Sequence, residues 1–266
     1  MTKVKKTQLL LIVAAVVLSV LLYFVPKHSD TTVEKTLTNV SDNTGTIEVF
    51  VNSAKGNLSA DLKPKAEDKN LDSLVAFWDK NKRPDIASFY FEKKASGINK
   101  AVDWLKAGDR YYYSVRFIKD PEETPLLYSS AMRCYEKGLK LEPNNTEAKI
   151  MLASCLVEGS PDPMKGITML REIEKTDSNN VTLQLNFAFF SVRSQQWDKA
   201  IKRFEKVIQI DSTYIEAYLH LADAYEQSGQ INKTIEMLEK YKSRTDDAMT
   251  REEIGKYIEQ LKQTMK

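Results

Sequence analysis

The 266-residue sequence has little of what most metal sites and disulfide-stapled domains are built from. It holds two cysteines and two histidines, too few for a multi-cysteine metal site or a disulfide framework. It also has only nine glycines and eight prolines, which is typical of a helical chain because both residues weaken helix interiors. The formal net charge is only +2, so the composition does not favour nucleic acid as a partner.

The short motifs of catalysis are missing as well. The sequence contains no phosphate-binding loop, no glycine-rich dinucleotide turn and no HExxH zinc motif. Neither His28 nor His220 lies near a serine or cysteine in a pattern typical of a nucleophilic site. Acidic pairs such as Glu122–Glu123 are sequence neighbours, whose side chains point in different directions on a helix. The sequence therefore predicts a protein that is not an enzyme and uses no cofactor, metal, small-molecule substrate or nucleic acid.

One long apolar run stands near the N-terminus. Residues 9–25 carry no charge, and as a helix they fall within the range of lengths that cross a membrane. Lysines at positions 3, 5 and 6 precede the run, which places residues 1–8 in the cytoplasm and sends the rest across. A cleaved signal peptide is the alternative, although the run ends in Tyr-Phe-Val-Pro rather than at a small-residue cleavage site. We expect a single-pass protein of the cytoplasmic (inner) membrane whose main domain is periplasmic.

Residues 26–66 are rich in threonine, serine, lysine and aspartate, and are predicted to form a polar spacer. Part of the spacer has apolar residues every three or four positions: Ile47, Val51, Ala54, Leu58 and Leu62. This spacing is one face of a helix, and Gly56 within it weakens the helix unless a partner surface supports it. We expect residues 47–62 to dock on the rest of the chain, either in a concave groove or along the exposed edge of the first repeat.

A pattern with a fixed period occupies the C-terminal part. The matching positions lie 34 residues apart: Leu183 and Ala217, Phe187 and Leu221, Ala188 and Ala222, Ala200 and Thr234, Phe204 and Leu238. Within each copy the apolar positions follow helical spacing in two groups separated by a polar turn, so each copy is predicted to be a helical hairpin. A period of this length is typical of a repeat array.

The helical hairpin resembles the tetratricopeptide repeat (TPR) family. The family signature Trp-x-x-Leu-Gly-x-x-Tyr is matched by Trp104, Ala107, Gly108 and Tyr111, with alanine in the leucine position. The resemblance implies an all-α protein in which the apolar run at 9–25 precedes an α-solenoid over residues 68–248. Five TPR-like hairpins are predicted at about 68–100, 101–145, 146–180, 181–214 and 215–248, followed by a capping helix at 249–266. The second hairpin carries an insertion before its second helix.

The resemblance also implies that the first helices of the hairpins line a concave face that binds protein segments. The carboxylate clamp found in part of the family is not matched, because only Asn186 fits and Glu216 has the wrong charge. That face instead carries apolar residues: Ile150, Val157, Leu185, Phe189, Val192 and Leu219. Two interpretations remain open, since a tight superhelix could bury these residues or they could line a groove for a partner.

The two cysteines lie on consecutive antiparallel helices of the predicted array. Cys134 and Cys155 are expected at similar heights along their helices, which a disulfide needs but which does not guarantee one. Cysteine is also common as a small buried hydrophobic residue. A disulfide and a pair of free buried thiols therefore both remain open.

Taken together, these features predict a membrane-anchored TPR scaffold. Such a protein would bind one or more protein partners, or assemble a complex, on the non-cytoplasmic side of the membrane. The alternative is a structural protein of the cell envelope that self-associates through its solenoid and binds no discrete peptide.

Overall fold

The computed structural model describes residues 44–58, 69–118 and 123–264. These residues belong to one unit, Thr44–Lys266, and all of their regular elements are helices. The predicted cytoplasmic tail, the apolar run at 9–25 and much of the spacer lie outside the described residues. In the part of the chain that is described, no helix is both long and apolar enough to cross a membrane.

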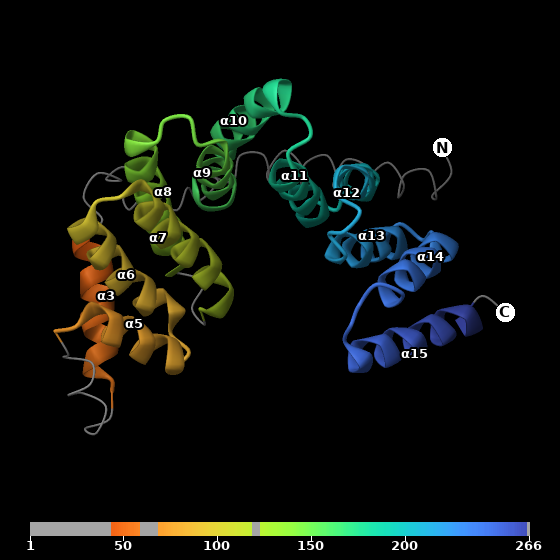
Figure 1. Cartoon of the computed structure of the whole chain (residues 1–266), viewed down its shortest axis with the longest axis horizontal. Helices are drawn as coiled ribbons and strands as arrows, with labels where there is room; N and C mark the ends of the chain where they lie inside the picture. The colour runs from red at the N-terminus through yellow and green to blue at the C-terminus, as the bar shows by residue number, and fades with distance from the viewer. Residues whose placement is uncertain (1–43, 59–68, 119–122, 265–266) are drawn as a thin grey trace, which may run out of the picture. The chain divides into compact units, whose positions relative to one another are not determined.

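Helices follow one another as hairpins along the chain (Figure 1). The pairs are α5 (Leu71–Lys80) with α6 (Pro84–Ile98), α7 (Ala101–Ser114) with α8 (Thr124–Leu141), α9 (Thr146–Gly159) with α10 (Pro163–Thr176), α11 (Val181–Arg193) with α12 (Trp197–Ile210), and α13 (Glu216–Gln227) with α14 (Ile231–Lys242). A last helix, α15 (Ala248–Thr264), packs against α14. A short 3-10 helix, Val115–Phe117, follows α7. The predicted all-helical hairpin architecture is confirmed.

Local sequence explains where several helices begin. Asn145 and Asn180 stand just before α9 and α11, and each side-chain oxygen accepts a hydrogen bond from a backbone N–H of the first turn, at 2.9 and 3.0 Å. Asn70 caps α5 in the same way. Such caps satisfy amide groups that the helix itself leaves unpaired. Pro84 is in the first turn of α6, where proline fits without losing a helical hydrogen bond.

The residues that match the family signature lie on α7, at its contact with α8. Gly108 lies against the ring of Tyr135, where an added Cβ would come within 2.8 Å of the ring carbons. Ala107 and Tyr111 are fully buried beside it. Trp104 is buried and its indole N–H donates to Asn99 at 3.0 Å. A small residue is therefore required at Gly108 because the two helices approach closely there.

The buried apolar residues form three clusters. The first spans α3 and α5 to α9, and the third spans α11 to α15. A smaller cluster between them includes Ile150, Leu170 and Leu183 and joins α9, α10 and α11. Polar contacts also join the third and fourth hairpins: Arg193 pairs with Glu158 at 3.1 Å, and the Ser154 hydroxyl donates to Asn186 at 2.7 Å.

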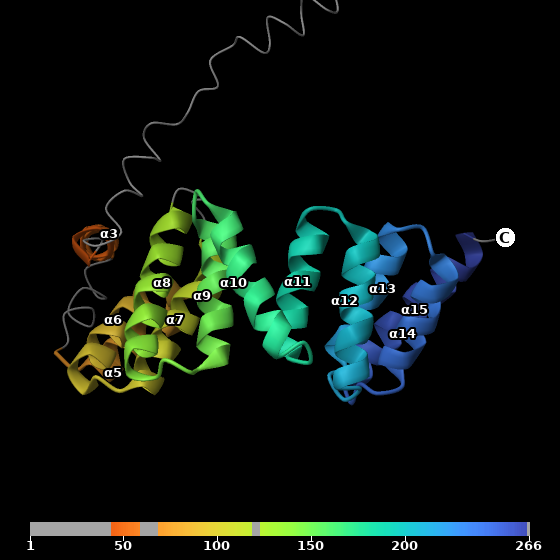
Figure 2. The ribbon, with the colours of Figure 1, turned by 90° about the horizontal axis from the view of Figure 1, so that it is seen from above.

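The amphipathic segment forms α3, Thr44–Gly56, so the helix begins and ends earlier than the predicted 47–62. Leu62 lies outside the described residues. Ile47 and Val51 are fully buried, and α3 packs against α6 and α8, the second helices of the first two hairpins (Figure 2). The segment docks on the repeat array as a helix, as predicted, but both predicted positions are wrong, because α3 lies neither in a concave groove nor on the edge of the first hairpin alone. An amphipathic face shows that a helix needs a partner surface but does not select which one.

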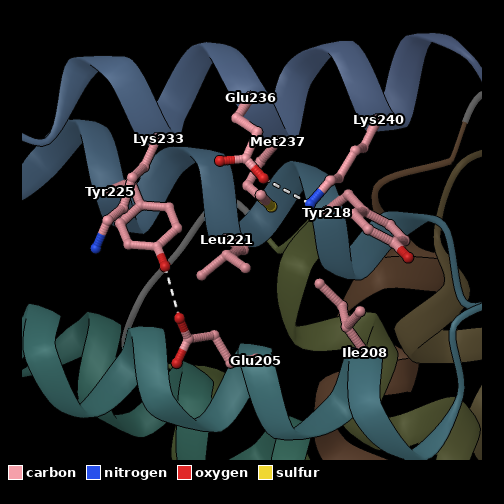
Figure 3. A pocket seen from close by; sticks show the side chains of 9 residues that line it. All are labelled: Glu205, Ile208, Tyr218, Leu221, Tyr225, Lys233, Glu236, Met237 and Lys240. Carbon is pink, nitrogen blue, oxygen red and sulfur yellow. Dashed lines mark hydrogen bonds and ion pairs between the residues drawn. The ribbon is translucent and has the colours of Figure 1, made fainter.

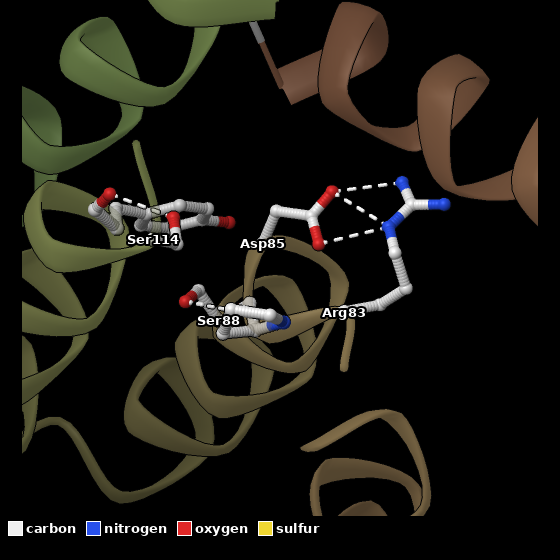
Figure 4. Close-up of polar contacts among 6 residues, drawn as sticks. Arg83, Asp85, Ser88 and Ser114 are labelled. Carbon is white, nitrogen blue, oxygen red and sulfur yellow. Dashed lines mark hydrogen bonds and ion pairs between the residues drawn. The ribbon is translucent and has the colours of Figure 1, made fainter. Parts of the chain in front are cut away.

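Charged side chains also contact α3. Glu48 of α3 pairs with Lys93 of α6 at 2.9 Å. The Arg83 guanidinium lies 5.5 Å from the ring of Phe50 and also binds both carboxylate oxygens of Asp85, at 2.8 to 3.1 Å (Figure 4). Asp85 is only 2% exposed, so loss of Arg83 would leave a buried carboxylate without its ion-pair partner. The hydrogen bond to Asp85 raises the pKa of the Arg83 guanidinium above its ordinary value.

Candidate functional site

The first helices of the fourth and fifth hairpins present an aromatic surface. Phe189 of α11 is 41% exposed. Its ring meets those of Phe204 and His220 edge-on, with centroid distances of 5.5 and 5.0 Å. His220 of α13 is stacked on Phe204 at 5.5 Å. An exposed ring is thus held in place by two others, one of them in the core. We call this surface the aromatic face and define it as Leu185, Phe189, Val192, Leu219 and His220.

Four of the six residues predicted to line a groove come together on this face. Leu185, Val192 and Leu219 are partly buried against the C-terminal core, and Phe189 is the most exposed of them. The other two lie with the cluster of the third hairpin, where Ile150 is fully buried and Val157 is partly buried. Ile150 is therefore a core residue and offers no surface to a partner, which corrects the prediction for that position. Binding by the remaining residues stays a prediction.

The two cysteines are free thiols, and both are buried. Burial raises the pKa of each thiol well above its ordinary value. Both thiols are therefore held in the neutral, unreactive form. Of the two alternatives that the sequence left open, the structure has the pair of buried thiols rather than the disulfide.

Charges next to the aromatic face are acidic. Glu216 lies one turn before His220 along α13 and Asp223 one turn after it, and both acidic residues are exposed. Burial lowers the pKa of the His220 imidazole below its ordinary value, and the attraction of Asp223 and Glu216 offsets only part of this effect. His220 is therefore neutral near pH 7, which suits its stacking on the apolar ring of Phe204.

A groove that the sequence analysis missed lies between second helices of neighbouring hairpins. Figure 3 shows it between α12 and α14, with α13 behind. Its volume is about 360 Å³. Its lining residues are Glu205 and Ile208 of α12, Tyr218, Leu221 and Tyr225 of α13, and Lys233, Glu236, Met237 and Lys240 of α14. We call it the outer groove.

Several polar groups of the outer groove are already paired. The Tyr225 hydroxyl donates to Glu205 at 2.6 Å, and Lys240 pairs with Glu236 at 2.7 Å (Figure 3). The Lys233 ammonium lies 5.0 Å from the centre of the Tyr225 ring. Burial and the bond to Glu205 raise the pKa of Tyr225, so the hydroxyl stays protonated at neutral pH. This chemistry suits recognition of another surface rather than proton transfer.

Comparison with known proteins agrees with the resemblance seen in the sequence. The family model described as "TPR repeat" matches residues 192–229, and the one described as "Tetratricopeptide repeat" matches residues 215–246. The chain therefore contains tetratricopeptide repeats over residues 192–246. The two matches cover α12, α13 and α14, which are the helices of the outer groove, together with the His220 side of the aromatic face. No curated protein matches the sequence.

Solved structures that are similar to this chain share little sequence with it. A tetratricopeptide repeat protein from Parabacteroides merdae is 14% identical, with 84% of this chain and 86% of that chain covered and a TM-score of 0.50. PilW, described as a type IV pilus biogenesis factor, is 14% identical over 74% of this chain and 97% of its own, with a TM-score of 0.48. YrrB, described as a TPR protein with an unusual peptide-binding site, is 19% identical over 73% and 95%, with a TM-score of 0.41. The likeness to the Parabacteroides merdae protein concerns the fold alone.

Proposed function

We propose that this TPR protein is a scaffold that binds a protein partner through its aromatic face, and that residues 9–25 anchor it in the cytoplasmic membrane. The observation that carries the binding proposal is Phe189, a large apolar side chain left 41% exposed on a regular helix. Its contacts with Phe204 and His220 fix the ring before any partner arrives. Side chains that are ordered in advance lose less conformational entropy on binding.

The surroundings of Phe189 favour a protein partner over a small molecule. Leu185, Val192 and Leu219 extend the apolar area along α11 and α13 but are only partly buried. Large side chains at the centre of such a patch contribute most of the binding energy in protein interfaces. The face is a surface formed by two adjacent helices, which suits an extended or helical segment of another protein.

The anchor proposal rests on the sequence. Lysines at positions 3, 5 and 6 precede the uncharged run 9–25, so the repeats are assigned to the periplasmic side by the positive-inside tendency. The test is labelling of a single cysteine introduced near Lys266 in intact cells, in a C134S/C155S background. Labelling by a membrane-impermeant reagent, together with retention in the membrane after a high-pH wash, supports the proposal. Protection from the reagent, or release of a product that begins near residue 27, contradicts it.

The binding proposal is tested by photo-crosslinking in the source cells. A photoreactive amino acid replaces Phe189 in one variant and Met164 in a matched control. Met164 is also a large exposed residue, 57% exposed on α10, but it lies outside the aromatic face. A protein crosslinked from position 189 and not from position 164 supports the proposal. Crosslinks to a second copy of the chain would instead indicate the self-associating alternative, and equal products from both positions would contradict specific binding.

A further inference from the structure

The array contains one Tyr–Glu contact twice, in equivalent positions of different hairpins. Glu92 directly follows Phe91 in α6, and Glu205 directly follows Phe204 in α12. Tyr111 stands three residues after Gly108 in α7, as Tyr225 stands three residues after Ala222 in α13. Tyr111 donates to Glu92 at 2.9 Å, and Tyr225 donates to Glu205 at 2.6 Å. The same Tyr–Glu hydrogen bond thus joins the first hairpin to the second and the fourth hairpin to the fifth.

The two copies differ in whether a side chain of the next second helix also binds the glutamate. In the first copy, Arg133 of α8 donates to both oxygens of Glu92, at 2.8 and 3.0 Å, and draws α8 onto α6. The equivalent position of α14 is Glu236, two residues after Thr234 as Arg133 is two residues after Ala131. Glu236 cannot donate to Glu205 and pairs with Lys240 instead. In the second copy no ion pair that the structure describes joins Glu205 of α12 to α14, and the outer groove lies between these two helices.

The first copy also shows what these second helices can bind. The helix α3 packs against both α6 and α8, and its Ile47 and Val51 are fully buried. Glu48 of α3 adds an ion pair with Lys93, the residue after Glu92. The surface formed by two neighbouring second helices of this array therefore accepts an amphipathic helix that brings an apolar stripe and a carboxylate.

We propose that the outer groove is a second docking site, which takes an amphipathic helix of a partner protein with acidic side chains beside its apolar stripe. Leu221, Ile208 and Met237 supply the apolar contact. Lys233 borders the groove and is exposed. Lys202 is also exposed and lies one turn before Glu205 on the same face of α12. Neither lysine forms an ion pair with any residue that the structure describes, whereas Glu236 is paired with Lys240 and Glu205 accepts the hydroxyl hydrogen of Tyr225.

The positive charges of Lys202 and Lys233 favour acidic side chains in the bound helix. An acidic partner would pair with Lys202 and Lys233 without breaking the Tyr225–Glu205 and Lys240–Glu236 contacts, whereas a basic partner would bring its cations next to both lysines. Exposed ion pairs change affinity by up to about fivefold each and are weakened by salt. The site is separate from the aromatic face, and its occupation does not depend on Phe189.

The test uses two synthetic 18-residue peptides with the same leucines at the i, i+4, i+7 and i+11 spacing that runs from Ile47 to Leu58. Glutamates flank the stripe in one peptide and lysines in the other. Fluorescence anisotropy with the full-length protein should show tighter binding of the glutamate peptide by roughly tenfold. The K202E/K233E variant should lose this preference. The control K106E/K165E, with two exposed lysines on α7 and α10 reversed, should retain it, as should Phe189→Ala.

Crosslinking places the bound peptide independently of affinity. A photoreactive group on the glutamate peptide should label α12 and α14, as read by mass spectrometry. Labelling elsewhere, absence of binding, or equal binding to K202E/K233E overturns the proposal, provided that thermal melting shows the variant to be folded. A peptide of residues 44–58 is the remaining comparison. If it binds the groove more tightly than the glutamate peptide, the occupant is a second copy of this chain and the proposed partner is wrong.

Discussion

Arg133 and Glu92 form a buried two-point ion pair between α8 and α6, with N–O distances of 2.8 and 3.0 Å. Glu92 is 7% exposed and also accepts the hydroxyl hydrogen of Tyr111 from α7. Three helices of the first two hairpins thus meet at one carboxylate. Burying a charge is costly unless a partner compensates it, so this contact fixes how the two hairpins pack together.

Replacing Arg133 with alanine should therefore destabilise the protein by about 3–5 kcal/mol, the range for breaking one partner of a buried pair. Thermal or urea unfolding measures the loss. Removing both partners, as Arg133→Met with Glu92→Leu, should cost clearly less than the sum of the two single changes, because no charge is left unpaired. Additive losses would show that the pair does not act as a unit.

Two equivalent positions of the repeat should be equally sensitive to truncation. Phe204 and Leu238 fill the same position of α12 and α14, and both are buried. Truncation of either to alanine should cost roughly 2–5 kcal/mol in the free energy of unfolding. Met249, which is 70% exposed, is the control and should change stability by less than about 0.5 kcal/mol. A small effect at Phe204 and Leu238 would mean that these side chains are not in the core.

Two glycines should respond oppositely to the same substitution. An added Cβ at Gly166 of α10 would collide with the backbone carbonyl of Ala153 in α9, whereas Gly97 of α6 has open space around it. Gly166→Ala should destabilise by roughly 1–3 kcal/mol through overpacking. Gly97→Ala should stabilise by up to about 1 kcal/mol because alanine favours a helix. Urea unfolding of both variants checks the signs, and the same sign for both would contradict the close packing of α9 and α10.

Stability should fall as the solution becomes acidic, in part because of His220. Burial lowers the pKa of this imidazole in the folded protein, so below its ordinary pKa of about 6.5 the unfolded chain binds more protons than the folded one. The stabilisation is complete above that pH and is lost as pH falls from it through the lower pKa of the folded protein. Thermal melting between about pH 7.5 and 5.5 should show a smaller drop for His220→Gln than for the unchanged protein. An identical drop would mean that His220 is not buried as a neutral group.

The sequence predicts the repeat architecture well because the architecture depends on local spacing. The burial of Phe204, Leu238 and Trp104 and the start of α6 at Pro84 all follow from helical periodicity and backbone chemistry. Helical spacing alone puts Ile150 on the predicted binding face, because a position on a helix shows the direction of a side chain but not what covers it. In the structure it is fully buried, in one cluster with Leu170 of α10 and Leu183 of α11.

The surface on which α3 packs, and the outer groove, could not be predicted from the sequence for a related reason. Periodicity shows that Ile47 and Val51 share a face, yet many surfaces of a repeat array could cover them. The outer groove depends on a tertiary difference, since Glu236 occupies the position at which Arg133 closes the first copy. A signal was present in the sequence, because Glu205 and Tyr225 repeat Glu92 and Tyr111. The contacts that these repeated residues make depend on the tertiary structure and not on their spacing alone.

The most direct test of the account is the affinity of the protein crosslinked from position 189, measured with purified components by calorimetry. Phe189→Ala should weaken binding by at least roughly tenfold, as expected for a central aromatic contact. The control Met164→Ala removes a comparably exposed side chain outside the aromatic face and should leave the affinity unchanged. Equal affinities for the unchanged protein and the Phe189→Ala variant would contradict binding through the aromatic face.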